Sequence, residues 1–275
     1  MTRQSALAEA DACDRIRRLM YEISGVNITD GKQELVRARI AKRMRVLGHE
    51  AVETYVDFVE GEEGARELAE MVDVLTTNKT SFFRELPHFE FLRKEVVPAW
   101  LRSGGPLRLW SAGCSSGEEP YSVAMLLAEE VPDLGRRDVK ILATDLSRTV
   151  LERARGGRYD AAIVEELPAR IRERYFRPVG RRGAGGAGYD VVPETRERVS
   201  FAPLNLMEVW PMRGPFNVIL CRNVMIYFDR PTREKLIRRF RQLLAPTGHL
   251  LVGHSESLSG MEHELTYVQP AVYRR

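Results

Sequence analysis

Strand-like and helix-like segments alternate regularly along the chain after residue 105. Short apolar runs predict strands at Leu107–Trp110, Val139–Ala143, Phe216–Cys221 and His249–Gly253. The segments between them predict helices at Glu119–Glu130, Arg148–Arg155 and Thr232–Leu244. This alternation is typical of an α/β fold, in which a parallel sheet carries helices on both faces.

The residues before this region predict helices and little else. We place them at Leu7–Ser24, Gln33–Leu47, Val52–Val59, Ala65–Leu75 and, after a polar loop-like run at 76–81, from Pro87 to about Leu101. The helix at 33–47 is the clearest, because four apolar residues fall on one of its faces: Val36, Ile40, Met44 and Leu47. Basic side chains cover the rest of its circumference: Arg37, Arg39, Lys42, Arg43 and Arg45.

One segment of the second half does not fit the alternation. The sequence RRGAGGAG occupies 181–188, between the apolar residues Phe176 and Tyr189. A glycine-rich hairpin inserted into the α/β region explains this pattern best, and a disordered linker is the alternative.

Composition excludes several classes of protein. The chain of 275 residues carries a net charge of +3, far from the basicity of a dedicated nucleic-acid binder. No apolar run approaches the ~18 residues of a membrane span, and the acidic N-terminus lacks the apolar core of a secretory signal. Three cysteines argue against a disulfide framework and for a cytoplasmic setting. Without paired cysteines or a histidine-rich cluster in the sequence, we expect no metal site.

The strongest local signal is the sequence WSAGCSSGEEPY at 110–121, between the first predicted strand and helix. In a doubly wound sheet this turn borders the ligand crevice, and Gly113 and Gly117 would allow a tight turn and close approach of a ligand. A bare helix N-terminus attracts phosphate, but Glu118 and Glu119 would repel it. A ligand with positive charge and hydroxyl groups fits better, and S-adenosylmethionine has both. Alternatively, the two glutamates only stabilise the helix dipole.

Two more polar groups follow predicted strands. Asp145 ends the run at 139–144, where an acid commonly binds ribose hydroxyls. The alternative is a helix N-cap, a frequent role of Asp. The sequence CRNVMIYF at 221–228 follows the strand at 216–220 and suits the floor of a cleft, although Asn223 could merely form a turn and Tyr227 could be packing.

Taken together, six stretches resemble the chemotaxis receptor glutamate methyltransferase family of the CheR type. In chain order they are TNKTSFFRE at 77–85, SGEEPYS at 116–122, ATDLS at 143–147, APLNL at 202–206, CRNVMIYFD at 221–229 and GHSES at 253–257. No single stretch is decisive, but six in order over nearly the whole chain form a specific match.

The resemblance implies a fold and its domains. A small all-α domain at 1–85 would precede a Rossmann-like, S-adenosylmethionine-dependent methyltransferase domain at 86–275. A small antiparallel β-subdomain would be inserted at about 175–200, with the glycine-rich stretch at 181–188 as one of its loops.

The resemblance also implies which residues hold the cofactor. Asn78, Thr80 and Arg84 would reach it from the interdomain segment, with Arg84 pairing with its carboxylate. Glu118 would lie beside its amino-acid or ribose part, and Asp145 near ribose or adenine. Gly113, in the turn before Glu118, is also assigned to cofactor binding. Two pairs would line the adenine and methionine ends: Asn205 with Leu206, and Asn223 with Val224.

The implied reaction is methyl transfer to receptor glutamates, giving methyl esters and S-adenosylhomocysteine. A glutamate, with a pKa of about 4.3, is already ionised at neutral pH and needs no general base. The enzyme would then act mainly by aligning the acceptor oxygen, the methyl group and the sulfur. Tyr227 is the first candidate for orienting the acceptor carboxylate and Arg222 the second. The partners would be the acidic methylation helices of the receptors, docking on the helix at 33–47 and on the β-subdomain.

The sequence is also compatible with other roles for the helix at 33–47 and for the whole chain. The helix at 33–47 could be an ordinary solvated surface. A nucleic-acid amino-methyltransferase is the enzymatic rival, and a non-catalytic cofactor-binding module is the rival from another class. The expected protein is a monomer in the cytoplasm that binds no nucleic acid and does not insert into membranes.

Overall fold

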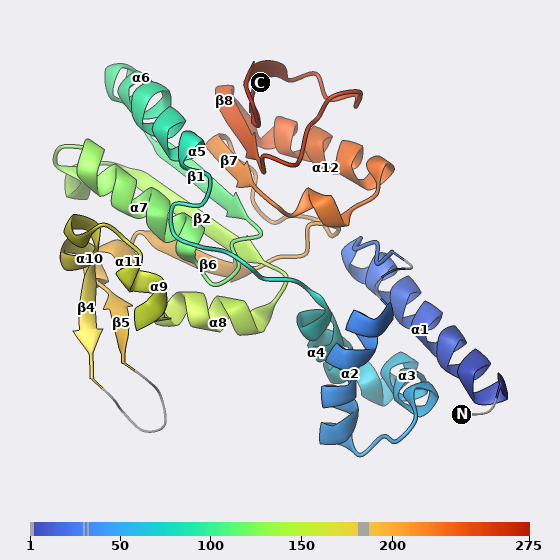
Figure 1. Ribbon diagram of the computed structural model, residues 1–275. Coiled ribbons are helices and arrows are strands. Elements are labelled where there is room, and N and C mark those ends of the chain that lie inside the picture. The colour runs from blue at the N-terminus through green and yellow to red at the C-terminus, as the bar shows by residue number, and fades with distance from the viewer. Residues whose placement is uncertain (1–2, 30, 32, 181–186) are drawn as a thin grey trace. The chain divides into compact units, whose positions relative to one another are not determined.

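A computed structural model describes residues 3–29, 31, 33–180 and 187–275 of the chain (Figure 1). The structure divides into two compact units, residues 1–77 with 227–233, and residues 78–226 with 234–275. Among the described residues, no helix combines the length and apolar character that crossing a membrane requires.

The first unit is built from helices. They are α1 (Arg3–Ser24), α2 (Gln33–Leu47), α3 (Val52–Glu60), the short turn η2 (Glu62–Gly64) and α4 (Ala65–Leu75). The expected apolar face of α2 is buried at Val36, Ile40 and Met44. Leu47 was expected on the same face but is 40% exposed, because it is the last residue of the helix. Gly48 then takes a left-handed φ of 77°, as a helix C-terminus favours.

The segment 227–233 groups with these helices through two hydrogen bonds. The amide of Asn27 donates to the carbonyl of Tyr227 at 2.8 Å. The hydroxyl of Tyr21 donates to Oδ2 of Asp229, also at 2.8 Å. These contacts place the segment in the first unit, although the residues directly before and after it belong to the second unit.

The second unit contains a large mixed sheet in the order β6-β2-β1-β7-β8-β10-β9 (Figure 1). The parallel strands are β1 (Leu107–Ala112), β2 (Val139–Asp145), β6 (Val199–Pro203), β7 (Phe216–Cys221) and β8 (Leu244–Val252). Strands β10 (Val272–Arg274) and β9 (Thr266–Gln269) continue the sheet in antiparallel pairing. The four predicted strands are confirmed, whereas β6, β9 and β10 were not predicted.

Helices connect these strands, as the alternation predicted. The long ones are α7 (Glu118–Glu130), α8 (Arg148–Gly156) and α12 (Arg230–Leu243), with a short turn η4 (Leu134–Arg136) before β2. The helix expected at 87–101 consists of α5 (Leu86–Phe91), the π-helical turn η3 (Leu92–Val96) and α6 (Val97–Ser103). Pro98 lies just after the π-helical turn, and the helical run continues through it to Ser103.

A second, three-stranded antiparallel sheet has the order β3-β5-β4. Its strands are β3 (Arg158–Asp160), β4 (Phe176–Val179) and β5 (Gly188–Val191), and the short helices α9 (Ala161–Glu165), α10 (Ala169–Tyr175) and α11 (Pro193–Arg196) accompany them. The pairing of β4 with β5 confirms the predicted hairpin, while β3 begins this sheet before the expected residue 175. Most of the glycine-rich loop, 181–186, lies outside the described residues.

Candidate functional site

The parallel strands bring the polar groups predicted from the sequence to one edge of the sheet. Gly113 directly follows β1, Asp145 is the last residue of β2, and Asn205 and Asn223 follow β6 and β7 by two residues. Because adjacent parallel strands end at the same edge, four segments that are far apart in the sequence meet there.

The loop after β1 makes contact with the loop after β7. Gly113 has a left-handed φ of 86°, and a Cβ at this position would lie 2.4 Å from Cγ2 of Val224. The amides of Gly113 and Cys114 both donate to the carbonyl of Thr144. The glycine therefore permits a tight turn, as predicted, but the side chain that approaches it closely is Val224.

Asp145 holds the same loop by accepting two backbone hydrogen bonds. The amide of Ser115 donates to Oδ2 at 2.8 Å, and the amide of Ser147 donates to Oδ1 at 3.0 Å. The N-cap of α8 is Ser147, whose hydroxyl oxygen accepts from the amide of Val150. The alternative that Asp145 itself caps this helix is therefore wrong.

The two glutamates at the start of α7 differ in their surroundings. Glu118 is buried and accepts a hydrogen bond from the hydroxyl of Ser116 at 2.7 Å. No basic side chain among the described residues forms an ion pair with it, and burial raises the pKa of its carboxyl group. Glu119 instead accepts from the hydroxyl of Ser111 at 2.7 Å and pairs with Arg222. Glu118 therefore remains the carboxylate suited to a cationic or hydroxyl-bearing ligand.

Arg222 lies at the centre of a buried ion-pair network. Its Nη1 donates to Oε2 of Glu119 at 2.8 Å. Its Nη2 donates to Oε2 of Glu85 at 3.1 Å and to the carbonyl of Arg84. These partners hold both Nη atoms of Arg222, while its buried Nε has no hydrogen-bond partner among the described residues.

Asn223 and the loop after β8 are linked by a second buried carboxylate. Glu256 accepts from the amides of Asn223 at 2.7 Å, Gly253 at 2.6 Å and Ile226 at 3.0 Å. Burial nevertheless raises the pKa of Glu256. The side-chain amide of Asn223 also donates to Oε1 of Glu85 at 3.3 Å. Glu85 and Glu256 stand in the motifs TNKTSFFRE and GHSES, but their roles depend on contacts that those motifs do not reveal.

The segment 78–85 packs against the loop after β1. The hydroxyl of Ser115 donates to the carbonyl of Asn78 at 2.8 Å, and the amide of Phe83 donates to the hydroxyl oxygen of Ser122 at 2.9 Å. Arg84 is partly exposed and donates through Nη1 to the carbonyl of Lys79. Asn78 and Arg84 therefore belong to the same edge as Asp145 and Glu118, and Thr80 lies between them in the chain.

The loop after β6 is held by an arginine that the sequence did not single out. Arg239 of α12 donates to the carbonyls of Leu206 and Glu208, and its guanidinium lies 3.8 Å from the centre of the Trp210 ring. Asn205 donates to Glu208 at 3.2 Å and accepts from the amide of Met207. These contacts fix the loop that was expected to line the adenine.

Tyr227 groups with the helical unit, where its backbone carbonyl accepts from Asn27. It ends the short turn η5 (Met225–Tyr227), four residues after Asn223. Its assignment as an acceptor-orienting residue stays a prediction.

Comparison with known proteins decides the family. Residues 78–273 match the family described as CheR methyltransferase, SAM binding domain, and residues 11–76 match CheR methyltransferase, all-alpha domain. The chain belongs to the CheR methyltransferase family. It is thus an S-adenosylmethionine-dependent methyltransferase. The CheR domains cover both compact units, and the small antiparallel sheet lies inside the second one.

Individual CheR relatives align over most of their length. A "Probable chemotaxis protein methyltransferase" of Rhizobium etli is 40% identical over 93% of this chain and 96% of its own. Chemotaxis protein methyltransferases of Borreliella burgdorferi and Escherichia coli are 37% and 39% identical, over 96% and 99% of this chain and 94% and 93% of theirs.

The residues at the strand ends fit S-adenosylmethionine. The cofactor carries a sulfonium, an ammonium, a carboxylate and ribose hydroxyls. Glu118 and Asp145 offer acceptors for the cationic and hydroxyl groups, and Arg84 offers a partner for the carboxylate. The loop at 113–117 lacks the lysine of a phosphate-binding loop and is followed by two acids, so phosphate fits poorly.

Proposed function

We propose that this protein transfers a methyl group from S-adenosylmethionine to glutamate side chains of chemotaxis receptors, giving glutamate methyl esters and S-adenosylhomocysteine. The observation that carries the proposal is the match of both CheR domains, together with the acidic, phosphate-excluding loop at the edge where the strands end. The names of the relatives support chemotaxis as the process.

The proposed roles at the cofactor follow from charge and hydrogen-bonding capacity. Glu118, without a basic partner among the described side chains, receives positive charge or hydroxyl groups. Asp145 accepts ribose hydroxyls while it braces the loop, and Arg84 pairs with the carboxylate. Asn78, Thr80, Gly113 and the pairs Asn205–Leu206 and Asn223–Val224 form the remaining wall.

The acceptor chemistry needs orientation more than proton transfer. Bound S-adenosylmethionine supplies an electrophilic methyl group on sulfur. A receptor glutamate is ionised at neutral pH, so the protein has no proton to remove. We assign Tyr227 to orient the acceptor carboxylate, and we assign Arg222 to hold Arg84 and Asn223 in place through Glu85.

Receptor docking is proposed on the basic residues of α2 whose side chains form no hydrogen bond or ion pair with another element among the described residues. Arg43 pairs with the buried Glu67, Arg39 donates to the carbonyls of Leu75 and Thr76, and Arg37 pairs with Glu9. Only part of the basic face expected from the sequence is therefore available. Two exposed basic residues remain on it, Lys42 and Arg45, next to Val46, which is 66% exposed.

An acidic helical partner suits this mixed surface of positive charge and apolar side chain. The β4–β5 hairpin is the proposed second contact with the receptor. We propose that the protein acts as a monomer and without nucleic acid.

The experiment that tests the acceptor class uses S-adenosylmethionine labelled in its methyl group. The purified enzyme is incubated with receptor-containing membranes or with nucleic acid, and each product is treated with mild base. We expect label on the receptor membranes that base releases as methanol, because esters hydrolyse readily. Base-stable label on nucleic acid would favour the amino-methyltransferase, and no transfer would favour the non-catalytic module.

A further inference from the structure

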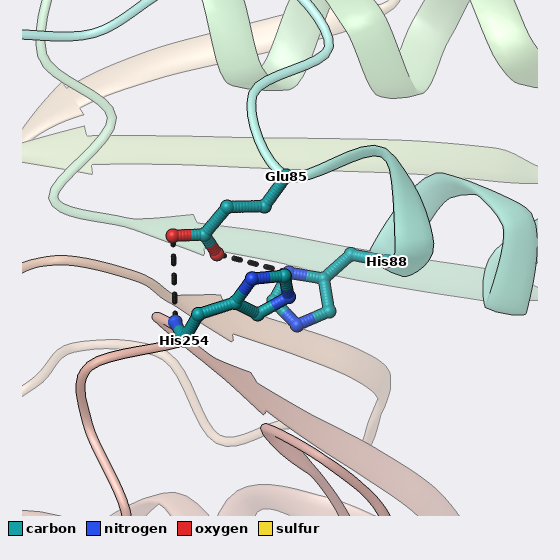
Figure 2. A group of neighbouring side chains, drawn as sticks. All are labelled: Glu85, His88 and His254. Atoms are coloured by element: carbon teal, nitrogen blue, oxygen red, sulfur yellow. Dashed lines mark hydrogen bonds and ion pairs between the residues drawn. The ribbon is translucent and has the colours of Figure 1, made fainter.

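Three side chains, none of which is assigned direct contact with the cofactor or the acceptor, converge beside the site (Figure 2). Glu85 precedes α5, His88 belongs to α5, and His254 follows β8. One ligand atom from each lies within 4.8 Å of the others. No local sequence pattern predicts this group, because His254 is far along the chain from the other two.

His88 is the member that requires an explanation. Its side chain is completely buried, yet neither Nδ1 nor Nε2 has a hydrogen-bond partner in the described part of the structure. Nδ1 lies 3.5 Å from Oε2 of Glu85 and faces it. Buried polar groups are rarely left unpaired, and those that are call for a water or an ion. Burial also lowers the pKa of His88 to about 4, so the ring is neutral and can ligate at neutral pH.

We propose that Glu85, His88 and His254 bind a transition-metal ion of the Zn²⁺ type. Two imidazoles and one carboxylate are a donor set that Zn²⁺ takes readily, with an open position for water. Ligands of a tetrahedral Zn²⁺ ion lie about 3.4 Å apart, close to the separation between His88 and Glu85. His254 is exposed, its ring centre lies 5.0 Å from that of His88, and one of its ring nitrogens lies within 4.8 Å of the other two ligand atoms.

The groups that face Glu85 set the strength of this site. Arg222 lies 3.1 Å from Oε2 and opposes a cation, while the side-chain amide of Asn223 and the backbone amide of His254 donate weakly to Oε1. Glu119 pairs with the other Nη of Arg222 and balances its charge. Two carboxylates thus face one guanidinium, which leaves one negative charge for the metal ion.

Such an ion would join two segments next to the cofactor residues. Glu85 directly follows Arg84, and its carboxylate contacts Asn223. His254 precedes Glu256, which holds the amide of Asn223. A bound ion would therefore fasten the loop after β8 to the start of α5 and stabilise the second unit.

Co²⁺ is the probe that tests the site, because its visible spectrum reports four-coordinate binding. The full, tag-free chain is treated with chelator, titrated with Co²⁺ and then back-titrated with Zn²⁺. We expect one equivalent to bind with intense visible bands, Zn²⁺ to displace it, and the melting temperature to rise on metal addition. A near-ultraviolet thiolate band should be absent, and its presence would place the ion on a cysteine and contradict the proposal.

The variant His254→Ala removes one ligand at an exposed position, where loss of folding is not expected. It should weaken Co²⁺ binding on the order of tenfold or more and abolish the rise in melting temperature. The matched control is His263→Ala, outside the group, which should bind like the wild type. If the wild type binds no stoichiometric metal at micromolar concentrations, or if His254→Ala binds it equally well, the proposal is wrong and water is the partner of His88.

Discussion

At the scale of single residues, Arg84 and Glu118 are assigned to groups of opposite charge on the cofactor. Arg84 pairs with the carboxylate, and Glu118 receives positive charge or hydroxyl groups. Arg84 keeps most of its donors available, since among the described residues its guanidinium donates only to the carbonyl of Lys79. Glu118 has a hydroxyl partner but no basic one among the described residues. These contrasting environments lead to separate predictions for cofactor binding.

Arg84→Ala should raise the dissociation constant of S-adenosylmethionine by about ten- to a hundredfold, the value of a charge-assisted hydrogen bond. Arg84→Lys should restore only part of the affinity, because an ammonium lacks the fork that matches a carboxylate. Calorimetric titration of both variants measures this. Equal affinities for Ala and Lys would mean that Arg84 does not pair with the cofactor.

Glu118 should make cofactor binding dependent on pH. Burial raises the pKa of its carboxyl group in the free protein, and binding favours the ionised form. The affinity should therefore rise with pH through this raised pKa and weaken as the solution is acidified below it. The neutral variant Glu118→Gln should bind more weakly at neutral pH and show a flatter profile. A wild-type profile that is as flat as that of the variant would contradict the assignment.

At the scale of the element, α2 divides its basic residues between structure and surface. Arg43 donates to both oxygens of Glu67, which also accepts from the hydroxyl of Tyr55 at 2.8 Å. Burial alone would raise the pKa of Glu67, but the hydrogen bonds from Arg43 and Tyr55 and the charge of Arg43 outweigh it, so the pKa is lowered. This pair joins α2 to α4 and is not available to a receptor.

The Glu67 pair should make the helical unit sensitive to acid. The lowered folded-state pKa means that its stabilisation is fully present above the unfolded value of about 4.3 and is lost as pH falls through the folded pKa. Glu67→Gln should lower the free energy of unfolding by about 2 kcal/mol at pH 7. Urea unfolding at several pH values should show this difference shrinking in acid. A difference that stays constant with pH would exclude the charged pair as its source.

The exposed basic residues of α2, Lys42 and Arg45, should govern receptor methylation. Lys42→Glu combined with Arg45→Glu should lower kcat/KM for receptor by about tenfold or more at low salt, while S-adenosylmethionine affinity stays unchanged. The matched control, Arg18→Glu with Arg66→Glu, makes the same charge change at exposed positions of α1 and α4.

Salt provides a second test of the same surface. The wild-type rate should fall as the screening length shortens toward about 8 Å at physiological ionic strength. If the α2 variant and its control methylate receptor equally at low salt, α2 is only a solvated surface.

At the scale of the whole molecule, the spacing of apolar residues predicted those helices and strands that bury one continuous face. The boundaries of α2, α4 and β7 agree with the sequence because apolar spacing and flanking breakers define them. Strands β9 and β10 escaped prediction because they are short, and β9 is largely exposed.

The site was predictable only in part for a related reason. The topology placed Asp145 and Asn223 at one edge, as parallel strands require. The network of Arg222 with Glu85 and Glu119 joins three segments that are distant in sequence, and no local pattern encodes it.

The proposed function depends most on the acceptor being a glutamate carboxylate of a receptor. Mass spectrometry of peptides from receptor membranes, incubated with the enzyme and S-adenosylmethionine, locates the added methyl group on a residue. We predict methylation on glutamate side chains that mild base reverses and that is lost when S-adenosylmethionine is omitted. A methyl group on lysine, arginine or a backbone nitrogen, or an unmodified receptor after full incubation with active enzyme, would contradict the account.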